Sequence, residues 1–127
     1  MNKEEIILKK LNQLKKSKFR SSFHLRKYMI DYIDKKGIQV IKKHTRDFIE
    51  QRLSMKYPYH DGMQTPTKGH PTFVAMHATA TCCRNCLFRI HHIEKGKELT
   101  NSQKNYIELL ILMWIKNEYK EIKNENK

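Results

Sequence analysis

The most informative feature of this sequence is a segment of 23 residues, His70 to His92, in which cysteine and histidine are concentrated. The segment contains all three cysteines of the chain and four of its seven histidines. Thiolates and imidazoles together are typical ligands of zinc, and the same groups supply redox or nucleophilic chemistry when no metal is bound. The segment therefore predicts a site with chemistry of its own, although the residue types alone do not specify an activity.

The spacing of the cysteines favours a metal site. If residues 82–91 form a helix, Cys82 and Cys86 lie one turn apart on one face, and Cys83 and Cys86 are also neighbours. Two thiols then reach one ion, and histidines complete a tetrahedral site, with the choice between the adjacent cysteines left open. The predicted cofactor is zinc in a structural role. The candidate ligands are Cys82, Cys83, Cys86, His70, His77 and His91.

Three alternative functions involve the same segment. A thiol at the start of a helix beside Arg84 has its thiolate favoured by amide groups and positive charge, so Cys83 is a candidate nucleophile with His77 as its base. A metal-dependent hydrolase would use Asp61 as a general base, unless Asp61-Gly62 is simply a turn. Alternatively, the cysteines are small apolar core residues of an interaction protein. The sequence leaves open whether the protein is an enzyme.

The first half of the chain predicts three helices that would carry this site. Residues 4–16 are amphipathic, with apolar side chains at helical spacing and lysines on the opposite arc. A second helix, capped by Ser21 or Ser22, runs to residue 36, and a third ends near residue 53. Residues 54–71 contain glycine and proline throughout and predict a long functional loop before the Cys/His segment.

The second half predicts two more helices. Thr79 or Thr81 can cap a short helix over residues 82–91, and the capping-box pattern from Thr100 to Gln103 opens the last helix. The tail from residue 118 is polar and is expected to fray. The expected fold is therefore all-α, a compact bundle of about five helices in one domain over residues 1–127, with its core at about residues 4–117.

The charge of the chain is strongly positive, with a formal net charge of +13. Residues 1–56 hold 16 Lys and Arg against 6 Asp and Glu. Such a basic field attracts polyanions, so nucleic acid is the predicted partner, although the same composition can also reflect a merely solvated surface. The candidate phosphate contacts are Arg20, Arg26, Lys27, Lys42, Lys43, Arg46 and Arg84.

The remaining composition predicts a cytoplasmic protein with reduced cysteines. No stretch of about 18 apolar residues is present, and the first residues lack the pattern of a signal peptide. Three cysteines, an odd number, do not predict a disulfide framework. The sequence does not specify an oligomeric state.

Several strings, spread over roughly residues 17–117, resemble a known bacterial family. They are Phe19-Arg20, Phe23-His24-Leu25, Asp61-Gly62, Gln64-Thr65-Pro66, Gly69-His70-Pro71, His77-Ala78-Thr79-Ala80-Thr81-Cys82-Cys83-Arg84, Cys86-Leu87, His91, Gly96 and Leu99-Thr100. The family that the chain resembles is Domain of Unknown Function 4186. This resemblance implies a small single-domain bacterial protein, and it implies no function.

Overall fold

The computed structural model describes residues 2–125 and contains seven helices, with no strand in this range. The helices are α1 (Lys3–Leu14), α2 (Lys18–Ser21), α3 (Lys27–Lys36), α4 (Ile38–Arg52), α5 (Pro71–Ala78), α6 (Arg84–His91) and α7 (Asn101–Glu125). The all-α class is confirmed, and the expected number of about five helices is close. None of these helices is long and apolar enough to cross a membrane.

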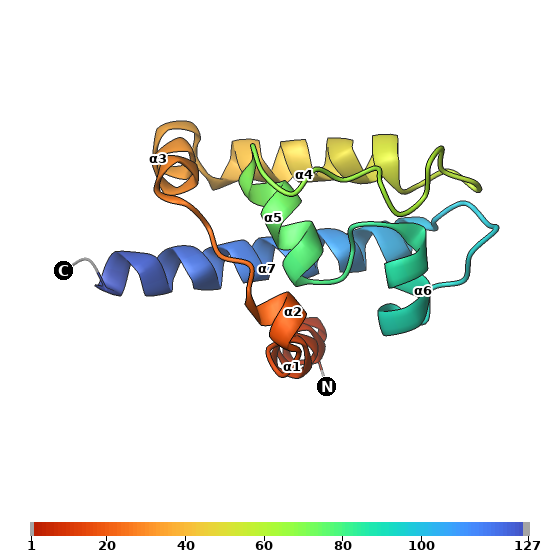
Figure 1. Cartoon of the computed structure of the whole chain (residues 1–127), viewed down its shortest axis with the longest axis horizontal. Helices are drawn as coiled ribbons and strands as arrows, with labels where there is room; N and C mark the ends of the chain where they lie inside the picture. Colours follow the sequence, from red (N-terminus) through yellow and green to blue (C-terminus); the bar gives the residue numbers. More distant parts are fainter. Residues whose placement is uncertain (1, 126–127) are drawn as a thin grey trace.

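Helix α7, the longest at 25 residues, packs against α1, α4 and α5, while α2 packs on α5 and α3 packs on α4 and α5. Figure 1 shows α7 along the length of the molecule, with α4 beside it and α5 between them. Helix α1 packs on α7 separately, because its Ile7 and Leu11 contact Leu110. The predicted capping box opens α7: Thr100 accepts a hydrogen bond from the amide of Gln103, and the Gln103 side chain accepts one from the amide of Thr100.

The expectation that the chain frays from Glu118 is wrong for residues 118–125, which continue α7. Glu118 is buried, and its Oε1 lies 2.7 Å from Nδ1 of His24 and accepts a hydrogen bond from the amide of Leu25. One turn further, Nζ of Lys123 lies 2.8 Å from Oδ2 of Asp34. These contacts tie the polar end of α7 to the chain around α3, while residues 126–127 of the expected tail lie outside the described range.

The second predicted helix starts later than expected and is preceded by an extra turn of helix. Ser17 caps the short α2, and α3 begins only at Lys27. Ser22, one of the two expected caps, instead donates its hydroxyl hydrogen bond to the carbonyl of Phe19. The residues between α2 and α3 are then held in a non-helical path, in which Leu25 is buried.

Helix α5 was not predicted because it is apolar on nearly all sides and so has no amphipathic period. Pro71 occupies its first position, where a missing amide hydrogen costs nothing, and His70 caps it through the ring. The helix packs against α2, α3, α4 and α7, which explains its uniform composition. Residues 53–70 before it contain no helix or strand.

One buried cation fixes the start of α6. Arg84 is only 2% exposed, and its guanidinium donates four hydrogen bonds to backbone carbonyls. The acceptors belong to two separate loops, Leu53 and Met55 on one side and Glu94 and Lys97 on the other. The side chain thus joins both loops to α6, and it is not available to phosphate, which corrects its predicted role in nucleic-acid binding.

We expect Arg84→Met to lower the free energy of unfolding by about 3 kcal/mol or more, because four backbone carbonyls, buried or partly buried, would lose their donor. Chemical denaturation measures this change. The matched control is Arg89→Met on the exposed side of α6, for which the change should stay within about 0.5 kcal/mol. Equal losses in the two variants would contradict the role given to Arg84.

Candidate functional site

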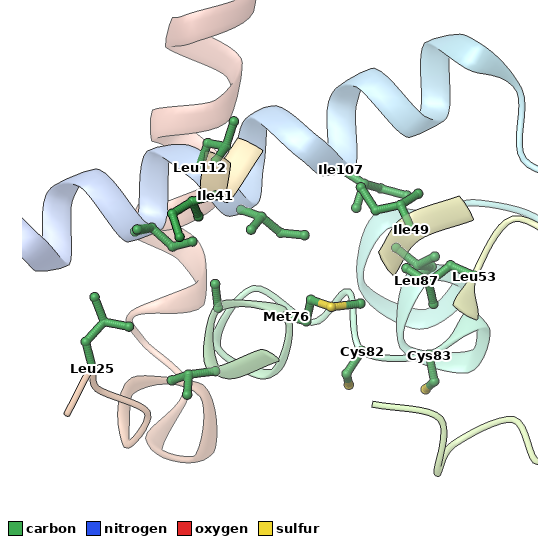
Figure 2. Packing of buried hydrophobic residues seen from close by; sticks show 14 of the residues in the cluster. Leu25, Ile41, Ile49, Leu53, Met76, Cys82, Cys83, Leu87, Ile107 and Leu112 are labelled. Carbon is green, nitrogen blue, oxygen red and sulfur yellow. The ribbon is translucent and has the colours of Figure 1, made fainter. Parts of the chain in front are cut away.

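The three cysteines lie together where α6 begins. Their sulfur atoms all lie within 4.8 Å of one another, and Sγ of Cys82 is 3.6 Å from Sγ of Cys86. Cys82 and Cys83 are buried at the edge of the hydrophobic core, and Figure 2 shows both sulfurs pointing away from the aliphatic side chains labelled there. Cys86 is partly exposed. We call these three residues the cysteine cluster.

Local backbone structure explains why the sulfurs meet. The helix predicted over residues 82–91 starts at Arg84, and its cap is Cys83 rather than Thr79 or Thr81. Sγ of Cys83 accepts a hydrogen bond of 3.3 Å from the amide of Cys86, as an oxygen does in an ordinary cap. This bond brings the side chain of Cys83 back over the first turn, where Cys86 projects.

A buried reversal of the chain delivers Cys82 to the same place. After α5, Ala80 adopts a left-handed conformation with φ of 58° and is fully buried. The hydroxyl of Thr79 donates to the carbonyl of Ala75 and lies 3.0 Å from that of Thr81, so both buried hydroxyls have partners. Thr65, from the long loop, donates to the carbonyl of Cys82 at 2.7 Å. The threonines expected as caps therefore hold the reversal instead.

Arg20 covers the sulfurs from the side of α2. Its Nη2 lies 3.4 Å from Sγ of Cys86, and its Nη1 lies 4.0 Å from Sγ of Cys82. The same Nη1 donates a hydrogen bond of 2.7 Å to the carbonyl of His77, which fixes the guanidinium in place. The structure therefore places Arg20 against the cysteine cluster, whereas the sequence suggested a contact to phosphate.

The electrostatics of the cluster favour one thiolate, at Cys86. Hydrogen bonds from Cys82 and Cys83 lower the pKa of Cys86, and Arg20 lowers it further. The pKa of Cys82 is raised by its hydrogen bonds with Cys83 and Cys86 and by burial. For Cys83, the bond with Cys82 lowers the pKa, but the bond with Cys86 and burial outweigh this effect. Cys86, rather than the predicted Cys83, is thus the most acidic thiol.

The predicted histidine ligands lie outside the cysteine cluster. His70 caps α5 through Nδ1, which accepts a hydrogen bond from the amide of Thr72, and its Nε2 lies 3.1 Å from Nδ1 of His44. Because Nδ1 is an acceptor, the ring proton of neutral His70 is on Nε2 and is donated to His44. His70 is therefore a structural residue within an aromatic group that includes Phe48 and Phe73.

His77 and His91 also have other partners. Nε2 of His77 lies 3.1 Å from the carbonyl oxygen of Thr65, and the ring stacks on Phe23. In His91, Nε2 donates to the carbonyl of Thr79 at 2.7 Å, so Nδ1 accepts the hydroxyl hydrogen of Tyr106 at 2.9 Å. Both nitrogens of His91 are therefore engaged, and the ring joins the reversal after α5 to α7.

Asp61, the predicted general base, caps the start of α6 from outside. Its Oδ1 accepts a hydrogen bond of 2.9 Å from the amide of Arg84, and its Oδ2 accepts one of 3.2 Å from the amide of Asn85. A carboxylate in this position satisfies the free amides and the positive end of the helix dipole. The long loop is therefore connected to the cysteine cluster through Asp61 and Thr65, and Asp61 has a structural role.

Two features of the site are not predicted by the sequence. A cysteine sulfur as helix cap has no common sequence signature, although Cys83 three residues before Cys86 matches the spacing of a side-chain cap. The contact of Arg20 spans more than 60 residues of chain, and a single arginine in a basic segment gives no signal for such a contact. The cap is local but made by an unusual residue type, whereas the contact of Arg20 depends on tertiary structure.

Fold and site together define a small all-helical protein with a three-cysteine cluster at a helix start. The chain belongs to the family described as Domain of unknown function (DUF4186), whose profile matches residues 8–116. This match confirms the resemblance seen in the sequence strings. No solved structure matches the chain.

The burial of His91 predicts a pH-dependent stability. Burial lowers the pKa of His91 from 6.5 to about 4, so the unfolded chain takes up this proton first as the pH falls. The contribution of neutral His91 to the free energy of unfolding is complete above about pH 6.5. It is lost towards pH 4, at up to about 1.4 kcal/mol per pH unit. His70 acts in the same direction, because burial and His44 lower its pKa to about 4.

We therefore expect the free energy of unfolding to fall between pH 7 and pH 5, and to fall less steeply in His91→Gln. Urea denaturation at several pH values measures both slopes. Comparing slopes removes the constant loss of hydrogen bonds in the variant, and a substitution at the exposed His92 serves as the matched control. Equal slopes for the wild type and His91→Gln would show that His91 is not the responsible group.

Proposed function

We propose that the cysteine cluster binds one zinc ion through Cys82, Cys83 and Cys86, and that the protein is a metal-binding module. The observation that carries the proposal is the closeness of the three sulfurs, all within 4.8 Å of one another. Sulfurs at a tetrahedral zinc lie about 3.8 Å apart, because each Zn–S bond is about 2.3 Å long. The separation of 3.6 Å between Cys82 and Cys86 fits this arrangement with little movement.

Charge balance supports a divalent ion. Three thiolates around Zn²⁺ leave one negative charge, and the guanidinium of Arg20 against two of the sulfurs supplies one positive charge. Hydrogen bonds from outer groups to ligand sulfurs are a regular feature of metal–thiolate sites. The amides at the start of α6 act in the same direction, because they favour negative charge on the capping Cys83.

The fourth ligand is not a histidine of the predicted set, because His70, His77 and His91 lie outside the cluster. A water molecule or an external ligand would complete the tetrahedron. The metal would join the start of α6 to the reversal that follows α5, which is a structural role. A hydrolase would also need a base near the metal, and Asp61, the residue proposed for it, is engaged as a helix cap.

We further propose that the module engages nucleic acid through exposed cations of α3 and α4. Arg26, Lys27 and Lys42 are exposed, and their side chains form no hydrogen bond or ion pair with the residues that the structure describes. Lys43 and Arg46 pair with Asp47 and Glu50 on their own helix, so they contribute less. The formal net charge of +13 adds long-range attraction for phosphates.

A thiol-based catalyst is the second candidate, and the state of Cys86 favours it. This residue is partly exposed, its pKa is lowered by Cys82, Cys83 and Arg20, and its sulfur lies 3.6 Å from that of Cys82. In this alternative Cys86 replaces Cys83 as the nucleophile. His77 has no contact with a sulfur and is not needed as its base, because Arg20 stabilises the thiolate directly.

Metal analysis of protein purified without an affinity tag tests the first proposal. We expect about one zinc per chain, and loss of zinc in Cys86→Ser because a ligand is removed. The matched control is His77→Gln, which should keep its zinc because the ring lies outside the cluster. Arg20→Gln should keep the metal but bind it roughly 10- to 100-fold more weakly, as expected for an outer-shell partner.

Stable folded protein without metal, in which one thiol reacts much faster with iodoacetamide than the others at neutral pH, would overturn the zinc proposal and support the thiol catalyst. Zinc lost equally in His77→Gln and Cys86→Ser would contradict the set of three cysteine ligands. Protein that is metal-free and has three slow thiols would contradict both candidates and favour the cysteines as core residues.

For nucleic acid, we expect weak duplex binding that falls steeply with salt. With three or four phosphate contacts, the affinity should drop roughly 40- to 150-fold between 50 and 200 mM salt, following a slope of about −0.9 per contact. Fluorescence anisotropy with a labelled duplex of mixed sequence measures the slope. Absence of binding at 50 mM salt, or binding insensitive to salt, would overturn this part of the proposal.

A further inference from the structure

The start of α3 and the end of the long loop border a groove that is separate from the cysteine cluster. Its volume is about 510 Å³, within the range of small-ligand sites. It is bounded on one side by the chain between α2 and α3 and on the other by residues 67–68. Its walls combine apolar and basic side chains, among them Phe23, Arg26, Tyr28, Lys68 and Val74.

The ring of Tyr28 is an anchored aromatic surface. Its hydroxyl accepts a hydrogen bond of 3.1 Å from the amide of Gly69, which holds the ring between α3 and the loop. Despite this anchor, 52% of the residue is exposed. An exposed ring with a fixed position loses little entropy when a flat ligand stacks on it, and nucleic-acid bases are stacked in this way on aromatic side chains.

Positive charge surrounds the ring. Arg26 and Lys68 line the groove and form no ion pair or hydrogen bond through their side chains within residues 2–125. His24, also in the wall, is already bound to Glu118, whose carboxylate faces another groove. No carboxylate lines this groove, so its basic groups lack an anion to balance them.

The backbone adds to this field at the start of α3. Arg26, its N-cap residue, provides no side-chain cap, and the amides of Lys27 and Tyr28 have no acceptor among the described residues. Free amides at a helix start favour a phosphate group. The same groove therefore offers an aromatic face for a base, and cations with amides for a phosphate.

We propose that this groove binds one nucleotide unit, with its base on Tyr28 and its phosphate near Arg26 and Lys68. The proposal rests on the nucleic-acid part of the proposed function and sharpens it. A base can stack on Tyr28 only when it is unpaired, so the groove selects single-stranded over duplex nucleic acid. Free mononucleotides carry the same chemistry and are the other source of such a ligand.

Fluorescence anisotropy with a labelled ten-residue oligothymidylate at 50 mM salt tests the groove. We expect Tyr28→Leu to bind roughly tenfold more weakly, because one stacked base is lost, and Tyr28→Phe to lose much less, because it keeps the ring and removes only the hydrogen bond that anchors it. Arg26→Gln and Lys68→Gln should each weaken binding several-fold. The control is Lys95→Gln, which removes one positive charge in the loop after α6, at the other end of the molecule from α3 (Figure 1).

The outcomes separate this proposal from the one it rests on. If Tyr28→Leu binds as the wild type does, or if Lys95→Gln weakens binding as much as Arg26→Gln, the groove is not the site, while binding by the basic surface stands. If the wild type binds neither single strand nor duplex at this salt concentration, both proposals fall. Tighter binding of duplex than of single strand would also overturn the groove.

Competition with unlabelled thymidine monophosphate then distinguishes a free nucleotide from a nucleotide within a strand as the ligand. Its displacement of the oligonucleotide from the wild type but not from Tyr28→Leu supports a groove that takes a free nucleotide. Lack of displacement, together with the loss expected in Tyr28→Leu, supports a groove for a nucleotide within a strand. Thermal unfolding of each variant confirms that the fold is kept.

Discussion

The hydrogen bonds of Arg84 to four backbone carbonyls are the constraint on which the site depends. A buried guanidinium needs hydrogen-bond acceptors, and here the carbonyls of two separate loops accept from both of its terminal nitrogens, while Nε has no partner among the described residues. The two loops are also joined to each other, because the amide of Leu99 donates a hydrogen bond of 2.9 Å to the carbonyl of Ser54. Once they are fixed, the first turn of α6 has one position, and Cys83 and Cys86 project from that turn.

Negative charge is stabilised at this helix start by three separate means. The carboxylate of Asp61 and the sulfur of Cys83 accept hydrogen bonds from backbone amides at the start of α6. Arg20 approaches the sulfurs from α2. An isolated structural cysteine needs none of these, because a buried neutral thiol behaves as a small apolar group. The concentration of amide and guanidinium donors is what a thiolate or a metal–thiolate group requires, and it favours chemistry over simple packing at the cysteine cluster.

The sequence predicted much of the fold, and the reason for each failure is physical. Amphipathic periods located α1, α4 and α7, and the Thr100–Gln103 pattern located a helix start, because both signals are local. Helix α5 has no such period, since it is buried on nearly all sides. In the site, cysteine spacing brought the thiols together correctly. The histidines nearby in sequence could not be excluded, because their partners, such as Thr79 and Tyr106 for His91, are determined by tertiary structure.

The cysteine cluster and the groove share one segment of chain. Arg20 on α2 binds the sulfurs and the carbonyl of His77, and three residues later Phe23 stacks on the His77 ring and forms a wall of the groove. The position of Phe23 therefore depends on α2, which is held by the hydrogen bonds of Arg20 and by packing against α5. Because Arg20 contacts the sulfurs directly, the metal binding proposed above would act on this residue first. The basic surface and the Cys/His segment, which seem independent in the sequence, are parts of one structure.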